Sequence, residues 1–539
     1  MKKYLSFVIA LLMVTMLVST ACTAKKVENP PQPKAEVKKG PNGEVYGGTY
    51  HIAINSEPPV IDPQVDTTLQ VYNLSRNIFN TLIRYKGNSL ELEPELLAEM
   101  PKTEADNVTY HFKLRNDVKF TNGTPLMAKD VKYTVERMLN PTTKAQNTWV
   151  YEEIKGAQDV IDKKATELAG FKITGDYTFD LILERPFGPF LSNLATPPAS
   201  IYPADYAKQQ GDQFGRKPIG SGPFKVADWK ANELLALDKN ADYFEKGFPF
   251  LDKVEYKVIK EEATRWLEFA KGNTDEESIP TAEFDAVAKG QTGVLLKYVA
   301  LNTYYLALNQ DVVKDKRVRQ AISMAIDRKK ILSVVRHDQG VVAKSFVTPG
   351  IPGALTNAAG FEYNPEKAKQ LLKDAGATGL KIEAWQRGGD KVVDDSLAIQ
   401  QMLKDIGIDW TVKIVDKATF NDARSKGNVP SNFGNWWADY PDPDNYLYTY
   451  FQSKSSKSMS VNYNNADADK ILADARGLAD QSKRQKMYQD LETKLLYDEY
   501  ALIPLFHLYE YYAAQKGVHG NLANPTGVGG LKTVWKDAK

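Results

Sequence analysis

Residues 109–139 read TYHFKLRNDVKFTNGTPLMAKDVKYTVERML, and this stretch decides the fold class. Tyr110, Phe112 and Leu114 alternate with polar residues, which is the period of a strand with one buried face. The Asn-Gly pair at 122–123 marks a turn, and the stretch AKDVKYTVERML after it has the spacing of an amphipathic helix. A half-buried strand followed directly by a helix indicates a mixed α/β protein.

Elements of both kinds continue along the chain. Residues 254–259 have the two-residue period of a strand, and helical spacing follows at 261–271. Asn364 and Pro365 are the residue types of an N-cap and a first helical position, and Gly376 follows the end of that helix. Further strands are predicted at 180–191, broken at Pro186, and at 502–512, and further helices at 318–326 and 482–497. No repeat of fixed period is present, so we predict an α/β fold with several sheets.

The first 21 residues have the layout of a secretory signal peptide. Lys2 and Lys3 precede a predominantly apolar run of 15 residues, 4–18, and small residues then lead to Cys22. The apolar run is too short and one-sided for a membrane span, so we expect an exported protein. Cys22, the only cysteine in the chain, resembles a lipoprotein cysteine, and a lipid there would hold the protein at a membrane. Ser19 stands where a lipobox prefers Leu, so secretion with a free thiol is the alternative.

Composition separates a tether from a folded region. Residues 22–48 are expected to be the lipidated cysteine and a disordered tether, since they are rich in Lys, Pro, Gly and Glu. The remainder is long enough for roughly three domains. Lys and Arg (69) nearly equal Asp and Glu (68), which argues against the concentrated basic face that a nucleic-acid partner requires.

Residues 435–445, NWWADYPDPDN, have the residue types of a pocket for a cation. A carboxylate at Asp439 is flanked by Trp436, Trp437 and Tyr440. A partly desolvated carboxylate pairs strongly with an ammonium group, and aromatic faces add cation–π attraction. The alternative interpretation is that the tryptophans are core residues and that Asp442 and Asp444 are solvated turn residues.

Eight motifs, in this order and spacing, resemble the extracellular solute-binding proteins of peptide/nickel type (family 5). Within that family the likeness is greatest to dipeptide- and oligopeptide-binding lipoproteins of ABC importers. The motifs are EPPVIDPQ (57–64), FKLRNDVKFTNGTPLMAKDVKYTVER (112–137), PIGSGPFKV (218–226), DKNADYF (238–244), YLALN (305–309), VRQAISMAIDRKKIL (318–332), YNPEKAKQLLKDAG (363–376) and WWADYPDPDNY (436–446).

The resemblance implies a two-lobed, three-domain fold of the periplasmic-binding-protein type (type II, cluster C). The implied domains are domain I at 49–78, 200–300 and 499–539, domain II at 79–199, and domain III at 301–498. The chain would cross between the lobes near 305–309 and again near 501–506. Closure of such lobes around a ligand is the expected motion.

The resemblance also implies a function. The protein would be the substrate-binding component of an ABC importer, a monomer that captures di- or oligopeptides between its lobes and delivers them to a membrane permease. It would be no enzyme and would need no cofactor or metal. It would face the periplasm or the cell exterior, held at the membrane through Cys22.

Several site residues follow from the resemblance. Trp436 to Asp439 match a W-x-x-D motif whose aspartate holds the α-ammonium of a peptide. Arg387 stands near the place of an arginine that holds the ligand's terminal carboxylate, and its alternative is an exposed loop arginine. Further expected cleft contacts are Trp385, Tyr305, Asn309 and Thr196. Trp385 is equally compatible with a core position.

Other functions remain as alternatives. The same architecture carries oligosaccharides, opine-like molecules, haem or nickel chelates in relatives, and Asp439 favours a ligand with a free amine. A secreted hydrolase is the alternative from another class, but the sequence has no G-x-S-x-G or H-E-x-x-H motif. The five histidines are scattered and predict no local metal site. Gly220 and Gly222 are expected to serve a tight turn rather than a phosphate site.

Overall fold

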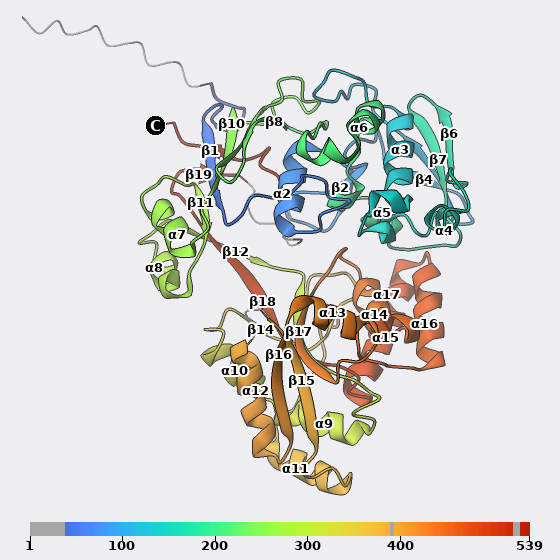
Figure 1. Ribbon diagram of the computed structural model, residues 1–539, viewed down its shortest axis with the longest axis vertical. Helices are drawn as coiled ribbons and strands as arrows, with labels where there is room; N and C mark the ends of the chain where they lie inside the picture. Colours follow the sequence, from blue (N-terminus) through green and yellow to red (C-terminus); the bar gives the residue numbers. More distant parts are fainter. Residues whose placement is uncertain (1–37, 389–392, 521–525, 527–528, 539) are drawn as a thin grey trace, which may run out of the picture.

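The computed structural model describes residues 38–388, 393–520, 526 and 529–538. The predicted signal peptide, Cys22 and most of the predicted tether lie outside the described residues. The described part forms two lobes (Figure 1). The upper lobe comprises residues up to 299 and those from 509 onward, and the lower lobe comprises residues 302–508. No helix in the described ranges is long and apolar enough to cross a membrane.

One sheet, ten-stranded over the described residues, runs through both lobes. Its order is β17-β13-β18-β11-β1-β10-β9-β8, and β12 and β14 also pair with β18. The bounds are β1 Thr49–Ile54, β8 Phe224–Lys230, β9 Leu234–Lys239, β10 Lys253–Val258, β11 Glu276–Ser278, β12 Val294–Val299, β13 Asn302–Leu308, β14 Gly340–Val342, β17 Ser431–Trp437 and β18 Ile503–Ala514. Together with the smaller sheets, this confirms the predicted α/β fold with several sheets.

Strand β18 connects the lobes. Its residues 509–514 pair with β11 and β12 in the upper lobe. Its residues 503–508 pair with β13 and β14 in the lower lobe. The chain passes from β12 to β13 beside it, so the two connections lie next to each other in one sheet (Figure 1). These connections lie near the two predicted crossings, at 305–309 and 501–506.

The upper lobe also contains a four-stranded antiparallel sheet of order β4-β5-β7-β6, all of it within residues 79–199. The strands are β4 Lys102–Thr103, β5 Thr109–Lys113, β6 Phe171–Gly175 and β7 Thr178–Ile182. Tyr110 and Phe112 are buried while His111 and Lys113 are exposed, as the alternation predicts. Helix α3 (Ala128–Leu139) covers the stretch predicted as a helix. The predicted strand at 180–191 ends earlier, at Ile182, because α5 (Phe190–Asn193) follows Pro186.

The lower lobe surrounds its strands with helices. Asn364 caps α11 as predicted, its side chain accepting from the Lys367 N–H at 3.0 Å, and Gly376 follows with a φ of 64°. Strands β15 (Lys381–Arg387) and β16 (Asp409–Val415) form a parallel pair. The helices are α9 Lys316–Ala325, α10 Arg328–Val334, α11 Pro365–Asp374, α12 Val393–Asp405, α13 Lys417–Ser425, α14 Pro443–Phe451, α15 Ser453–Ser458, α16 Ala466–Gly477 and α17 Gln481–Thr493.

Helix α2 (Leu69–Ile78) lies in the upper lobe and faces the lower one (Figure 1). Gly220 and Gly222 pack against its end: a Cβ at Gly220 would lie 2.1 Å from the Ile78 carbonyl oxygen, and one at Gly222 2.5 Å from the Ile78 carbonyl carbon. These glycines therefore permit close backbone packing that fixes α2. The other upper-lobe elements are β2 Ile83–Tyr85, β3 Leu92–Pro94, α4 Ala157–Ile161, α6 Ala204–Gln210, α7 Glu262–Ala270, α8 Phe284–Ala288, β19 Val518–His519 and β20 Trp535–Lys536.

Candidate functional site

A cavity of about 360 Å³ lies between the two lobes. Its walls are predominantly apolar and come from both lobes. The described residues that line it are Thr67, Leu69, Tyr72, Arg76, Tyr85, Trp149, Ala195, Thr196, Pro197, Pro198 and Thr526 of the upper lobe and Trp437, Ala438 and Asp439 of the lower lobe. A ligand bound here contacts both lobes at once, so its binding favours the closed arrangement. We call this space the interlobe cavity.

One face of α2 forms the upper wall. Leu69, Tyr72 and Arg76 recur at helical spacing and line the interlobe cavity. The opposite face, with Leu74 and Ile78, is buried in the core of the upper lobe. The amphipathic pattern of the helix thus directs one aromatic and one cationic side chain to the interlobe cavity.

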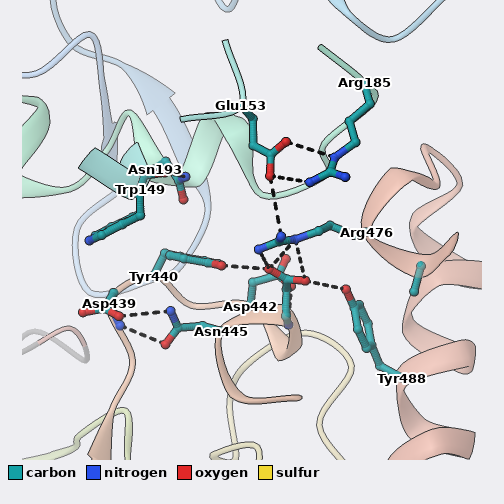
Figure 2. A network of polar contacts seen from close by, with 12 residues as sticks. Trp149, Glu153, Arg185, Asn193, Asp439, Tyr440, Asp442, Asn445, Arg476 and Tyr488 are labelled. Atoms are coloured by element: carbon teal, nitrogen blue, oxygen red, sulfur yellow. Dashed lines mark hydrogen bonds and ion pairs between the residues drawn. The ribbon is translucent and has the colours of Figure 1, made fainter. Parts of the chain in front are cut away.

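The loop between β17 and α14 places Asp439 on the lower wall. Strand β17 ends at Trp437, and the Asp442 side chain caps α14 by accepting from the Asp444 N–H at 2.9 Å. Asn445, in the first turn of α14, donates from Nδ2 to Asp439 Oδ2 at 3.2 Å. Its Oδ1 accepts from the Asp439 N–H at 3.1 Å. Asn445 therefore holds both the backbone and the side chain of Asp439 (Figure 2).

Among the described residues, the Asp439 carboxylate has no cationic partner. Within the described part of the chain, no Lys or Arg nitrogen lies within 4.0 Å of it, and Asn445 supplies its side-chain hydrogen bond. The Asp439 residue is exposed toward the cavity, yet desolvation by the surrounding protein raises the pKa of its carboxyl group to about 6. Across the cavity, burial and then the charge of Asp439 raise the pKa of Tyr72. A carboxylate held in this state is stabilised by any cation that enters.

The two tryptophans face opposite ways, as neighbours on a strand do. Trp437 lines the interlobe cavity. Trp436 packs against Tyr450 with ring centroids 5.3 Å apart and donates from Nε1 to Asn445 Oδ1 at 2.9 Å. One tryptophan of the pair therefore lies at the cavity, and the other packs against the lower-lobe core.

Asp442 and Asp444 belong to buried ion pairs. Asp442 Oδ1 lies 2.7 Å from Arg484 Nη2, and Asp444 Oδ2 lies 3.0 Å from Arg476 Nη2. The Asp444 side chain is fully buried and accepts further hydrogen bonds from Tyr440 at 2.8 Å and from a second tyrosine hydroxyl. Their interpretation as solvated turn residues is therefore wrong. Burying these two carboxylates requires a cationic partner for each, and α16 and α17 supply one arginine apiece.

Arg476 also reaches the other lobe. Its Nη1 lies 3.5 Å from Glu153 Oε1, and Glu153 in turn pairs with Arg185 at 3.0 Å (Figure 2). The Gly188 N–H donates to the Arg476 carbonyl at 2.9 Å. Trp149 and Tyr440 pack across the same edge, with ring centroids 5.5 Å apart. We call Glu153, Arg185 and Arg476 the interlobe latch, because they join the lobes beside the cavity.

Of the remaining predicted contacts, Thr196 lines the interlobe cavity and donates to the Asn193 carbonyl at 2.6 Å. Tyr305 is 4% exposed, and its hydroxyl lies 2.7 Å from that of Tyr450. Asn309 is 3% exposed and donates to the carbonyls of Gly427 and Val429 at 2.9 and 3.1 Å. Neither Tyr305 nor Asn309 is among the described residues that line the cavity, since their polar atoms bond within the lower lobe.

Arg387 and Trp385 lie on β15. The Trp385 Nε1–H donates to Glu383, and Lys413 lies over its ring at 4.8 Å from the centroid. Arg387 ends the strand and is half-buried. The structure does not bring either residue to the described walls of the interlobe cavity.

Among the lining residues that sequence reasoning missed are Tyr72, Arg76 and Trp149. Arg76 is half-buried and donates to Thr81 Oγ1 at 3.1 Å and to the Ala195 carbonyl. No carboxylate of the described residues lies within 4.0 Å of its nitrogens, and burial lowers its pKa. Helical spacing shows Tyr72 and Arg76 on one face, but only the tertiary structure shows that this face meets the other lobe.

Comparison with known proteins agrees with this architecture. The profile of the bacterial extracellular solute-binding proteins, family 5, middle part, matches residues 91–458. Oligopeptide-binding protein AppA of Bacillus subtilis is 29% identical over 534 residues, which cover 92% of each chain. Heme-binding protein A of Haemophilus influenzae is 26% identical over 554 residues, covering 97% of this chain and 98% of the relative.

A solved structure is similar over almost the same length. The periplasmic binding protein DppA from Helicobacter pylori, in complex with the peptide STSA, superposes with a TM-score of 0.77 at 27% identity. The match covers 92% of this chain and 99% of that one. The two chains therefore share their fold over the matched length.

Proposed function

Because the chain belongs to family 5 of the bacterial extracellular solute-binding proteins, we propose that it is the peptide-binding component of an ABC importer. It captures di- or oligopeptides in the interlobe cavity and delivers them to a membrane permease. Members of this family bind solutes and are not enzymes. The observation that carries the proposal is the Asp439 carboxylate, which faces the cavity without a cationic partner among the described residues.

The free α-amine of a peptide is the cation that suits this carboxylate. An ammonium–carboxylate hydrogen bond is stronger than a neutral one, and closure of the lobes removes water from it. Trp437 and Trp149 supply aromatic faces on opposite walls, which favour a cation between them. Hydrogen bonds to the peptide main chain would add affinity without reading side chains. Such a receptor accepts peptides of many sequences.

Two arginines are candidates for the terminal carboxylate of the peptide. Arg76 faces the interlobe cavity and has no carboxylate partner in the described structure. Arg387 is the candidate that the resemblance implies. A guanidinium group suits either role because its donors match both carboxylate oxygens. Arg76 would favour the shortest peptides, since it lines the same cavity as Asp439.

Transport requires the lobes to open and close. The adjacent connections at β12–β13 and β18 provide a hinge, and the interlobe latch holds the opposite edge. A lipid on Cys22 would keep the protein, as a monomer, near its permease at the outer face of the membrane. Release of the ligand would follow opening of the latch.

An oligosaccharide is the second candidate ligand. The walls contributed by Trp149, Trp437 and Tyr85 would also suit sugar rings. Opine-like molecules and nickel chelates are the other ligands compatible with the architecture. The unpaired carboxylate of Asp439 favours a peptide over these ligands, because a peptide carries a free α-amine.

Isothermal titration calorimetry with four ligand classes tests the proposal. The ligands are trialanine, N-acetyl-trialanine, maltotriose and a nickel chelate, each titrated into purified protein freed of bound ligand. We expect trialanine to bind at least 100-fold more tightly than its acetylated form. Tight binding of maltotriose or the chelate with no binding of trialanine would overturn the peptide assignment and keep the solute-binding role.

A further inference from the structure

A second cavity, of about 410 Å³, lies in the upper lobe and has one lining residue in common with the interlobe cavity. Leu69, which is 41% exposed, lines both. The second cavity lies between the face of the large sheet and α2. Its described lining residues are Ile52, Ala53, Ile54, Asn55, Leu69, Gln70, Asn73, Leu74, Asn77, Tyr256, Arg265, Glu276, Glu277, Ser278, Leu296, Tyr298, Tyr512, Gly529, Gly530 and Leu531. We call it the side cavity.

Glu276 is the uncompensated charge of the side cavity. Its Oε2 accepts from the Tyr50 hydroxyl at 3.1 Å, and no Lys or Arg nitrogen of the described residues lies within 4.0 Å. The nearby cations are taken: Arg265 pairs with Glu277 at 3.2 Å and Lys536 with Asp275 at 2.7 Å. Burial raises the pKa of Glu276 to about 7. Like Asp439, Glu276 is a carboxylate with a raised pKa and no cationic partner among the described residues.

Aromatic side chains surround this carboxylate. Ile52 of β1 is the register partner of both Glu276 and Tyr256, which places the three on neighbouring strands. Tyr298 and Tyr512 lie in parallel planes with ring centroids 6.3 Å apart, and both line the side cavity. Burial and then the charge of Glu276 raise the pKa of Tyr256. A carboxylate among aromatic faces is a setting in which cations bind.

We propose that the side cavity binds the basic side chain of a peptide whose α-amine is held at Asp439. The inference rests on the proposed function, since it assigns a second part of the same ligand. A lysine ammonium or an arginine guanidinium would neutralise Glu276 through a charge-assisted hydrogen bond and would lie against Tyr298 and Tyr512. An acidic side chain would be repelled, and an apolar one would leave the carboxylate desolvated without a partner.

The dimensions indicate which residue of the peptide carries the basic side chain. A sphere of 360 Å³ is about 9 Å across, and an extended peptide advances about 3.3–3.6 Å per residue. A peptide that starts at Asp439 therefore spans the interlobe cavity with between two and three residues, which brings the third residue to the border at Leu69. The basic side chain is that of the third residue.

The test uses three tetrapeptides that differ only at the third position: Ala-Ala-Lys-Ala, its norleucine analogue and its glutamate analogue. Affinities are measured by calorimetry at pH 8, where the Glu276 carboxylate is ionised. We expect the lysine peptide to bind at least tenfold more tightly than the norleucine peptide, and the glutamate peptide to bind most weakly. Glu276→Gln should reduce the lysine preference to less than twofold and leave binding of the norleucine peptide within threefold of wild type.

Three further variants distinguish an effect on the side cavity from an effect on the amine site. Asp439→Asn should weaken all three peptides and keep the lysine preference. Asp285→Asn, at an exposed acidic residue of the upper lobe, should change neither the affinities nor the preference. Tyr298→Leu should lower the lysine preference at least threefold while circular dichroism shows a folded protein, which covers a failure of Glu276→Gln to fold.

Each contrary result has its own meaning. Equal binding of lysine and norleucine peptides to the wild type, or an unchanged preference in Glu276→Gln, would overturn the side-cavity assignment and leave the peptide function standing. Failure of every peptide to bind the wild type would overturn the proposed function, and this inference with it.

Discussion

The substitution Asp439→Asn tests the proposed amine site most sharply. Asparagine keeps the shape of the side chain and an acceptor for Asn445, whose bonds to Asp439 measure 3.2 and 3.1 Å, but it removes the charge. Asp439 is exposed in the ligand-free structure, and closure of the lobes would bury its pair with an ammonium group. Removing one partner from a buried ion pair costs about 3–5 kcal/mol. Since each 1.4 kcal/mol is a factor of ten, the dissociation constant of a peptide should rise by about two to four decades.

The pH dependence of peptide affinity tests the same site. The pKa of Asp439 is raised to about 6 in the ligand-free protein, and a bound ammonium group would lower it by favouring the charged form. Peptide affinity should therefore rise with pH and fall as pH drops through 6, by about tenfold between pH 7 and pH 5. Asp439→Asn should abolish this slope, because the group that titrates is gone.

Calorimetry with trialanine and N-acetyl-trialanine combines the change in the protein with a change in the ligand, as in a double-mutant cycle. Acetylation of the ligand should cost the wild type about two to four decades and cost Asp439→Asn less than threefold, since the interaction is then already lost. Asp285→Asn serves as the control for a lost surface charge. If acetylation weakened binding to Asp439→Asn as much as binding to the wild type, the amine would have another partner and the reasoning would be wrong.

Three further predictions concern closure, stability and the second end of the ligand. Glu153→Gln removes the interlobe ion pair, so small-angle scattering should show a larger radius of gyration and peptide affinity should fall about threefold to tenfold. Asp444→Asn leaves Arg476 without its buried partner, and chemical denaturation should show a loss of about 3–5 kcal/mol in the free energy of unfolding, whereas little change would contradict the role of this pair. Arg76→Gln and Arg387→Gln decide between the two candidate arginines. The variant that raises the dissociation constant of a dipeptide at least tenfold, but not that of its C-terminal amide, identifies the partner of the ligand's carboxylate. If neither variant changes the dissociation constant, both arginines are excluded.

Much of the fold was predictable because it depends on local patterns. The alternation at 109–114 predicts β5, and the N-cap chemistry of Asn364 predicts the start of α11. The eight motifs predicted the family, which the profile match confirms. The acidic turn was ambiguous because its burial depends on Arg476 and Arg484, which follow it by more than thirty residues.

The walls of the cavities could be predicted only in part. Asp439 and Trp437 stand two residues apart in a recognisable motif. Arg76 and Glu276 are ordinary charged residues in the sequence, and each becomes notable only because the described structure gives it no ion-pair partner. A missing partner is a property of tertiary packing, and no local pattern encodes it.

The central claim is that the interlobe cavity selects ligands by a free amine at Asp439. Native mass spectrometry of the purified protein, after exposure to an equimolar mixture of short peptides and their N-acetylated forms, tests it most directly. The account predicts that the wild type retains masses of the free peptides only and that Asp439→Asn retains none. Equal retention of acetylated and free peptides, or retention of neither, would contradict it.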